Sequence, residues 1–343
     1  MPYFCSYSFF THLAYLPNRR IDPMERNHFL IQLFFLLVVA GVFGVLPLFV
    51  DNGTMRFLTD FFLLIGIAQL WNLLAGFGGI VSIGQHLFLG AGAYAFFAMT
   101  SILGIHPYVS LPLAIPFGAA LAVPVYAILS RLKLAYFAIG SWVLAEVMLL
   151  LAGKIPGFGG GSGVSLSPSI VKTFGTSIGD RMSNIYWLAL GITVFIILLI
   201  IILLQSRHGL ALKAMRDNET AAMAVGVNTV FVKVLLFLIS GAFLSLLGAV
   251  GTLLRLRISP AASFNITDGT IFIIFIVVVG GIGRVIGPVL GAIIFLVLRE
   301  TLSAYGPIYM IILGGLAIAT MLIEPKGAAG LFGRISKKIR NAG

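Results

Sequence analysis

The chain has 343 residues, of which 59% are hydrophobic and only 10% are charged, and its formal net charge is +11. Soluble domains carry about 25% charged residues, so this composition excludes an ordinary soluble protein and predicts an all-α polytopic membrane protein. The stretch 61–130 contains no Lys, Arg, Asp or Glu, which leaves room for about three membrane spans. No basic and aromatic groove for nucleic acid is visible, so we ascribe the positive charge to positive-inside bias and attraction to anionic lipid.

The first residues differ from the rest of the chain. Residues 1–23 have no apolar core long enough for a signal peptide, whereas Met24 is followed closely by an apolar run. We therefore expect 1–28 to be an N-terminal cytoplasmic extension, whose first 23 residues are either mobile or the product of a misplaced start codon. The lone Cys5 excludes an internal disulfide and a cysteine-based metal site.

Apolar segments follow one another along the chain and are the candidate membrane-spanning helices. Two of them, 269–283 and 285–300, are each about 15 residues, or about 22 Å as helix, which is shorter than the roughly 30 Å hydrocarbon core. They are expected either to span the membrane or to form a re-entrant pair, so the expected number of spans is eight to ten, some of them broken. The segments are 29–50, 57–77, 80–104, 109–130, 134–152, 185–204, 230–254, 269–283, 285–300 and 303–323.

Basic clusters give the expected orientation, because Lys and Arg stay on the cytoplasmic side. Even numbers of segments separate the clusters, so all of them are able to lie inside and both termini are predicted to be cytoplasmic. A transmembrane domain over 29–333 and a basic cytoplasmic tail over 334–343 are the expected organisation. The clusters are Arg19, Arg20 and Arg26; Arg131 and Lys133; Arg207 to Arg216; and Arg334 to Arg340.

A polar island, 205–228, lies between two long apolar segments and reads QSRHGLALKAMRDNETAAMAVGVN. Asn218 is predicted to cap a second short helix, Glu219 to favour its N-terminus and Gly226 to end it. Small residues at helical spacing predict a narrow face of small side chains. Another protein's backbone is able to approach such a face closely, so the island is predicted to be a docking surface. That face comprises Ala211, Ala214, Asn218, Ala222 and Val225.

A long break, 153–184, is expected on the opposite side of the membrane. Its core, 157–168, is rich in Gly and Ser, which favours turns and flexibility. This segment either contacts a partner outside the membrane or is a plain solvated connector, and the sequence favours the two roles equally.

Two Gly-rich stretches, 76–92 and 280–291, interrupt apolar segments in the two halves of the chain. Paired interruptions of this kind are typical of transporter sites built on broken helices, where freed backbone groups line a wet cavity. Close helix packing is the alternative, and we favour it where small residues are spaced four apart. Those residues are Gly283, Gly287 and Gly291, and Gly241, Ser245 and Ala249.

Polar residues within the apolar segments are the candidates for a translocation pathway. Ser82, Gln85 and His86 are the stronger ones, and Asn72 and Gln69 are weaker because each is able to satisfy a neighbouring helix. An intramembrane carboxylate is functional by default, although we favour a structural pairing for Glu146. Arg284 is expected in a turn at the interface, where its guanidinium reaches water or lipid phosphate.

Catalytic motifs are missing from the sequence. We find no phosphate-binding G-x-x-x-x-G-K-[ST] loop, no H-E-x-x-H and no G-x-S-x-G. The sequence therefore predicts no catalytic residue, no metal site and no cofactor in this chain.

Taken together, four motifs resemble those of ABC-transporter permeases of the branched-chain amino-acid uptake family, in particular the M-type subunit. The resemblance runs from about Gln69 to Arg334. Its carriers are NLLAGFGGIVSIGQHLFLGAGAY (72–94), HGLALKAMRDNETAAMAVGV (208–227), GGIGRVIGPVLGA (280–292) and EPKGAAGLFGR (324–334).

This resemblance implies a permease architecture in a bacterial plasma (inner) membrane, with the polar island as the coupling segment. The implied partners are a second permease subunit, two ATP-binding cassette ATPases that hydrolyse the ATP, and an external, periplasmic solute-binding protein. Glu146 falls where the family carries a Glu in its fifth segment. The residues implied in the ATPase contact are Gly209, Ala211, Arg216, Asp217, Asn218, Glu219 and Ala222.

The expected cargo is a branched-chain, hydrophobic amino acid. His86-Leu87-Phe88 and Arg284 depart from the usual family pattern, so urea, short amides and aromatic acids remain alternative solutes. An ion-coupled secondary transporter is a less favoured alternative because intramembrane carboxylates are scarce. A membrane enzyme is the least favoured.

Overall fold

The computed structural model describes residues 23–302, 306, 308–324 and 327–330. The chain forms two compact units, 1–42 and 43–343. The first unit contains most of helix α1 (Pro23–Val45), so the last residues of the expected extension are already helical. Residues 1–22 of that extension and the tail 334–343 lie outside the described residues.

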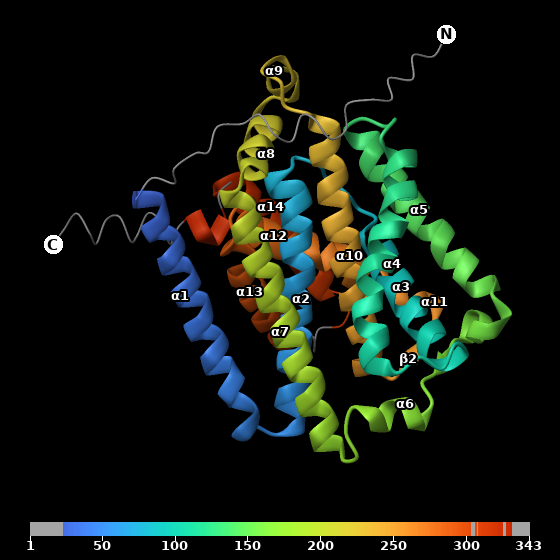
Figure 1. Ribbon diagram of the computed structural model, residues 1–343. Helices are drawn as coiled ribbons and strands as arrows, with labels where there is room; N and C mark the ends of the chain where they lie inside the picture. Colours follow the sequence, from blue (N-terminus) through green and yellow to red (C-terminus); the bar gives the residue numbers. More distant parts are fainter. Residues whose placement is uncertain (1–22, 303–305, 307, 325–326, 331–343) are drawn as a thin grey trace, which may run out of the picture. The chain divides into compact units, whose positions relative to one another are not determined.

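The second unit is built almost entirely from helices (Figure 1). Its described parts also include π-helical turns at Leu73–Phe77, Ala98–Ile102 and Thr267–Ile271 and one pair of short strands, β1 (Val164–Ser165) and β2 (Arg257–Ile258). The longer helices are α2 (Asn52–Asn72), α4 (Pro107–Leu129), α5 (Ala135–Lys154), α7 (Ile178–Gln205), α10 (Thr229–Arg255), α13 (Gly287–Leu302) and α14 (Ile308–Ile323). The shorter helices are α3 (Gln85–Phe97), α6 (Pro168–Thr173), α8 (Arg207–Asp217), α9 (Glu219–Ala224), α11 (Pro260–Ser263) and α12 (Phe272–Gly280).

Seven helical stretches among the described residues are long and apolar enough to cross a membrane. They confirm the predicted all-α, multi-pass membrane fold. The remaining apolar segments form shorter helices: the apolar part of α1 and its continuation (Leu33–Leu48), α3 and α13. The seven stretches are Asn52–Phe77, Pro107–Leu129, Ala135–Lys154, Ile178–Gln205, Thr229–Arg255, Pro260–Gly280 and Ile308–Gly330.

Side chains cap the N-termini of several of these helices. At α7, the Ser177 hydroxyl accepts a hydrogen bond from the Asp180 N–H at 3.0 Å, and the Asp180 carboxylate accepts one from the Ser177 N–H. At α2, Asp51 accepts from the Gly53 N–H and the Thr54 hydroxyl. These two hydrogen bonds, the Thr54 one first, hold the pKa of the exposed Asp51 carboxyl below its ordinary value.

Helices α2 and α10 lie at the centre of the second unit, and α14 lies at its periphery. α10 packs against α3 and α4, α2 against α7, and α12 against α13. About four-fifths of the apolar window of α2 is buried (78%), compared with 12% for the stretch that contains α14. The apolar side chains that α4, α5, α7 and α14 leave exposed are suited to lipid or to another subunit.

Small residues allow α3, α4 and α10 to approach closely. A Cβ added at Gly92 would lie 2.0 Å from the Ser245 carbonyl oxygen, and one at Gly118 would lie 2.3 Å from that of Gly241. The Ser245 hydroxyl donates to the Phe88 carbonyl at 3.2 Å, which ties α10 to α3. Larger side chains here would push the three helices apart.

Helices α8 and α9 lie at one end of the second unit, and α6 and β2 lie at the other (Figure 1). As predicted, Asn218 caps α9 by accepting from the Ala221 N–H at 3.0 Å, and Gly226 (φ +89°) follows its end. The small-residue face that the sequence predicts is not presented as one surface, since the chain is extended at Asn218, between α8 and α9. Ala222 is buried against the rest of the chain rather than presented beside Ala211.

The Gly-rich segment at the opposite end is more structured than its composition predicts. β1 pairs with β2 in antiparallel register, Val164 opposite Ile258. Phe158 packs against the rings of Tyr94 and Phe97. An aromatic anchor and a strand pair therefore hold a segment whose glycines alone would suggest flexibility.

Candidate functional site

The first Gly-rich stretch breaks the helical path between α2 and α3. After the π-helical turn the chain reverses at Gly79 (φ +69°), and the residues before α3 are not helical. Side chains satisfy the backbone groups that this break frees: Trp71 Nε1 donates to the Ser82 carbonyl at 2.9 Å, and the Ser141 hydroxyl accepts from the N–H groups of Ile83 and Gly84. The break is thus compatible with a membrane interior.

The second Gly-rich stretch forms the turn 281–286 between α12 and α13, and α2 holds it. Asn72 Oδ1 accepts from the Gly283 N–H at 2.8 Å, while Asn72 Nδ2 donates to the Arg284 carbonyl at 3.0 Å. Gln69 Nε2 donates to the Val285 carbonyl at 2.6 Å. Two helix breaks from the two halves of the chain are therefore bound to each other.

Arg216 of α8 contacts the same place. Its guanidinium donates to the Gly76 carbonyl at 3.2 Å, and a Cβ at Gly283 would lie 3.1 Å from Arg216 Nη1. Arg284 lies in a turn, as predicted, and its guanidinium donates to the carbonyl of Ala329. We call this cluster the break joint, and it comprises Gln69, Asn72, Gly76, Arg216, Gly283 and Arg284.

The glycines of the second stretch have different surroundings. A Cβ at Gly287 would lie 2.2 Å from the Gly281 carbonyl oxygen, and one at Gly291 would lie 1.8 Å from that of Ile276. Both positions are close contacts between α12 and α13. Gly283 differs, because it sits in the turn with φ +73°, a conformation that favours glycine.

The predicted pathway residues of the first stretch are buried in the protein. Ser82, Gln85 and His86 are each at most 4% exposed, and His86 Nδ1 lies 3.0 Å from the Thr270 hydroxyl. Among the described residues, Gln85 Oε1 and His86 Nε2 have no hydrogen-bond partner. Glu146 lies on α5, half-buried and within electrostatic range of His86, and Trp142 Nε1 donates to its carboxylate at 3.0 Å.

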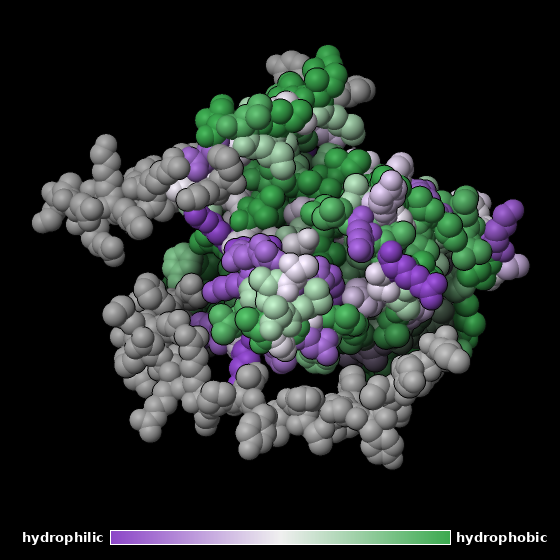
Figure 2. All heavy atoms as spheres, turned by 90° about the horizontal axis from the view of Figure 1, so that it is seen from above, coloured by the Kyte–Doolittle hydropathy of each residue, from purple (hydrophilic) through white to green (hydrophobic). Residues whose placement is uncertain are grey.

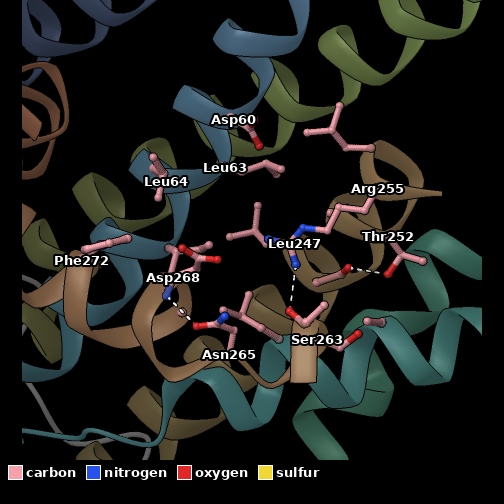
Figure 3. A pocket seen from close by; sticks show the side chains of 18 of the residues that line it. Asp60, Leu63, Leu64, Leu247, Thr252, Arg255, Ser263, Asn265, Asp268 and Phe272 are labelled. Atoms are coloured by element: carbon pink, nitrogen blue, oxygen red, sulfur yellow. Dashed lines mark hydrogen bonds between the residues drawn. The ribbon is translucent and has the colours of Figure 1, made fainter. Parts of the chain in front are cut away.

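A cavity of about 230 Å³ lies at the end away from α8 and α9, among α2, α3, α10 and the chain from 262 to 272 (Figure 3). None of the predicted pathway residues lines it. Its charged lining is Arg56, Asp60, Arg255, Arg257, Asp268 and Arg299. Its apolar lining includes Leu63, Leu64, Ile67, Leu89, Leu247 and Phe272.

Sequence reasoning missed the acidic residues of this cavity. Asp60 lies within the apolar segment 57–77, so the rule that singled out Glu146 also applied to it. Asp268 precedes another apolar segment by one residue. The arginines stand at or beyond helix ends, where sequence alone does not distinguish a cavity lining from contact with the membrane interface.

The π-helical turn Thr267–Ile271 connects the cavity with α3. Asp268 and Gly269 line the cavity, and Thr270 contacts His86. A Cβ at Gly269 would lie 2.8 Å from His86 Cβ, so nothing larger than hydrogen separates the two elements there. π-helical turns often occur at functional sites. A row of polar groups thus leads from the cavity through His86 toward the first helix break.

The polar island presents a different surface from the one expected. Gly209 is buried, since a Cβ there would lie 2.1 Å from the Leu204 carbonyl oxygen, and Ala222 is 2% exposed. Glu219 is exposed and paired with Lys233. Of the other residues implied in the ATPase contact, Arg216, Asp217 and Asn218 are exposed and Ala211 is half-buried.

Exposed apolar side chains lie on α8, on α9 and just after α9; the sequence singled out Val225 among them, but not Leu210 or Met223. Leu210 is 59% exposed, Met223 50% and Val225 80%. Figure 2 looks onto this end and shows hydrophilic side chains gathered near its middle, with hydrophobic surface around them. Apolar side chains amid polar ones on a protruding segment are suited to a protein partner.

Among the described residues, seven helical stretches able to cross a membrane, paired helix breaks and a charged cavity are the features of a multi-pass membrane transporter component. The chain belongs to the family described as "Branched-chain amino acid transport system / permease component", whose model matches residues 53–321.

Curated relatives carry related names. The high-affinity branched-chain amino acid transport system permease protein LivM of Escherichia coli (strain K12) is 29% identical over 86% of this chain and 74% of its own length. LivM of Salmonella typhimurium is 28% identical over the same shares. A probable branched-chain amino acid transport permease protein LivH of Methanocaldococcus jannaschii is 25% identical over 70% of this chain and 80% of its own length. No solved structure matches the chain.

Proposed function

We propose that this chain is the membrane permease of an ATP-driven importer of branched-chain amino acids. The family and the names of the relatives support this cargo. The assembly comprises a second permease subunit, two ATPases that hydrolyse the ATP, and an external solute-binding protein, and this chain itself holds no cofactor. It lies in a bacterial inner membrane with both termini cytoplasmic.

The contact between Arg216 and the first helix break carries the proposal. Arg216 lies on α8, which protrudes at one end, yet it hydrogen-bonds Gly76 at the first helix break. Asn72, one turn before Gly76, binds the second break through Gly283 and Arg284. A displacement of α8 is therefore transmitted through short, directional contacts to both breaks at once.

The mechanism follows from this arrangement. Closure of the ATPase pair pushes α8 and α9, and Arg216 passes the displacement to Gly76 and to the turn 281–286. Because each break is a non-helical hinge, the half-helices beyond it change tilt and open the pathway to one side at a time. The buried, unpartnered Gln85 Oε1 and His86 Nε2 become exposed to solute and water in the open states.

The test uses the assembly purified from its native membrane, with its subunits identified by mass spectrometry and reconstituted in proteoliposomes. We expect uptake of radiolabelled L-leucine that requires ATP and persists with an uncoupler. Urea and benzoate serve as alternative cargoes. ATP-independent uptake that collapses with the uncoupler would instead identify an ion-coupled transporter.

A matched pair of variants tests the docking surface. Val225→Asp places a charge on an apolar side chain that is 80% exposed, and we expect it to abolish ATP-driven uptake and to release the ATPases. Leu134→Asp adds the same charge at the same end, in the loop before α5, where Leu134 is 92% exposed, and uptake is expected to survive. Normal uptake by Val225→Asp would exclude this surface as the docking site.

A further inference from the structure

The charged groups of the cavity share one space, and among the described residues they form no ion pair shorter than 4 Å with one another. Four arginines and two aspartates line it. Within the described part of the chain, the ion pairs closer than 4 Å are Arg216–Asp217 and Lys233–Glu219, and both lie outside the cavity. Asp60 and Asp268 thus face arginines at longer range, with room for a ligand to bridge them.

Arg255 is held in place for such a role. Its Nη1 donates to the Ala262 carbonyl at 3.1 Å, which fixes the guanidinium at the edge of the cavity. Figure 3 shows the side chains of Arg255, Asp60 and Asp268 converging on the same space from three elements. A guanidinium with free N–H groups is the side chain best suited to bind a carboxylate.

The remaining wall of the cavity is apolar. Leu63, Leu64 and Ile67 lie at helical spacing on one side of α2, with Leu247 and Phe272 contributed by other elements. The volume of about 230 Å³ is below the roughly 300 Å³ at which pockets for drug-sized ligands begin. The cavity therefore suits one small solute that carries a positive and a negative group at one end and an aliphatic group at the other.

We propose that this cavity binds the zwitterion of an aliphatic α-amino acid, with its carboxylate at Arg255, its ammonium at Asp60 and Asp268, and its side chain against Leu63, Leu64 and Ile67. This inference rests on the proposed function and deepens it, because it gives the permease its own solute-recognition site. Urea has neither charge and an aromatic acid has no ammonium, so the same chemistry selects against the alternative cargoes.

Binding is measured on the purified assembly in lipid nanodiscs with the solute-binding protein left out, using tritiated L-leucine. We expect L-valine and L-isoleucine to compete. 4-Methylpentanoate, which lacks the ammonium, and 3-methylbutylamine, which lacks the carboxylate, are expected not to compete at the same concentrations. Competition by either single-charge analogue as strong as that of L-isoleucine would overturn the proposal.

Variants locate the site. Asp60→Asn and Asp268→Asn each keep the shape of the side chain, and we expect each to weaken leucine binding about tenfold, the effect of losing one charge-assisted hydrogen bond. Lys172→Gln removes a charge from α6, outside the cavity lining, and is expected to leave binding unchanged. Two independent variants keep the test informative if one of them fails to fold.

The experiments distinguish failure of the binding-site proposal from failure of the importer proposal. ATP-driven leucine uptake by the wild type, together with unchanged binding in both aspartate variants, would reject the cavity and retain the importer. Leucine binding that depends on Asp60 and Asp268, in an assembly without ATP-driven uptake, would retain the cavity and reject the importer.

Discussion

Asn72 binds the two halves of the chain together through a single amide. Its oxygen accepts from Gly283 and its nitrogen donates to Arg284, so both ends of the side chain are used. The side chain is fully buried, and no charged group of the same shape offers a donor and an acceptor at once. The sequence suggested a pathway group or a helix contact, and the structure places Asn72 against the turn 281–286.

Replacing Asn72 with Asp should lower stability. The carboxylate keeps the acceptor for Gly283 but loses the donor for Arg284, which leaves a carbonyl unpaired and buries a charge, at a cost of about 1–3 kcal/mol or more. Thermal unfolding of the purified chain measures the loss. Asn52→Asp is the control, since Asn52 is exposed in the first turn of α2, where an acidic residue is favoured. Equal melting temperatures for the two variants would contradict the role of Asn72.

Gly269 should matter for uptake because its lack of a side chain lets the π-helical turn approach α3 closely at His86. The Cβ of Gly269→Ala would lie 2.8 Å from His86 Cβ and separate the π-helical turn from α3. We expect a several-fold fall in leucine uptake. Gly191→Ala is the control, because Gly191 lies on α7 outside the cavity lining and has nothing within 4 Å of an added Cβ. Similar uptake by the two variants would show that the contact is not needed.

At the scale of elements, the α12–α13 hairpin depends on glycine at its contact. Gly291→Ala would place a Cβ 1.8 Å from the Ile276 carbonyl oxygen, so the two helices must separate, at a cost of about 1–3 kcal/mol. Gly191→Ala on α7 meets nothing within 4 Å and should be neutral or stabilising, by up to about 1 kcal/mol of helix propensity. Melting temperatures of the two purified variants should therefore shift in different directions, and a stable Gly291→Ala chain would disprove the close contact.

The helix breaks are also organised at this scale. Residues 80–84 have lost the hydrogen bonds of a helix, and the side chains of Trp71 and Ser141 from α2 and α5 replace them. A non-helical segment at membrane depth is tolerated only where protein satisfies it in this way. The break is thus built into the packing of neighbouring helices.

At the scale of the whole molecule, the predicted orientation places α8 and α6 on opposite sides of the membrane. In a Cys5→Ser background, Lys172→Cys should react with a membrane-impermeant maleimide added to intact cells. Lys213→Cys should react only after permeabilisation. Lys172 is on α6 and Lys213 is on α8, and these two helices lie at opposite ends of the second unit (Figure 1). Labelling of Lys213→Cys in intact cells would invert the orientation and remove the basis for ATPase docking.

Contacts within the second unit also connect its two ends. The cavity lies at one end and α8 and α9 at the other, and contacts through Gly269, His86 and the first helix break lie between them. Alternating access requires such a connection, because a motor at one end must change the affinity or exposure of a site at the other. The break joint and the π-helical turn are the parts that provide it.

The sequence by itself determined the membrane class, the apolar segments, the polar island and the cap at Asn218. These properties are local: hydropathy, charge and capping are read within a few residues of one another. The four motifs were also sufficient to predict the permease family, which the family match over 53–321 confirms.

Only the tertiary structure decided which residues form the cavity and the break joint. Asn72 and Arg284 are 212 residues apart in the chain, and no periodicity relates them. Gly209 and Ala222 resemble surface residues in the sequence but are buried, because their exposure depends on how α8 and α9 fold back on the other helices. Asp60 and Asp268 become one site for the same reason: packing brings two distant segment ends to one space, and local composition carries no record of it.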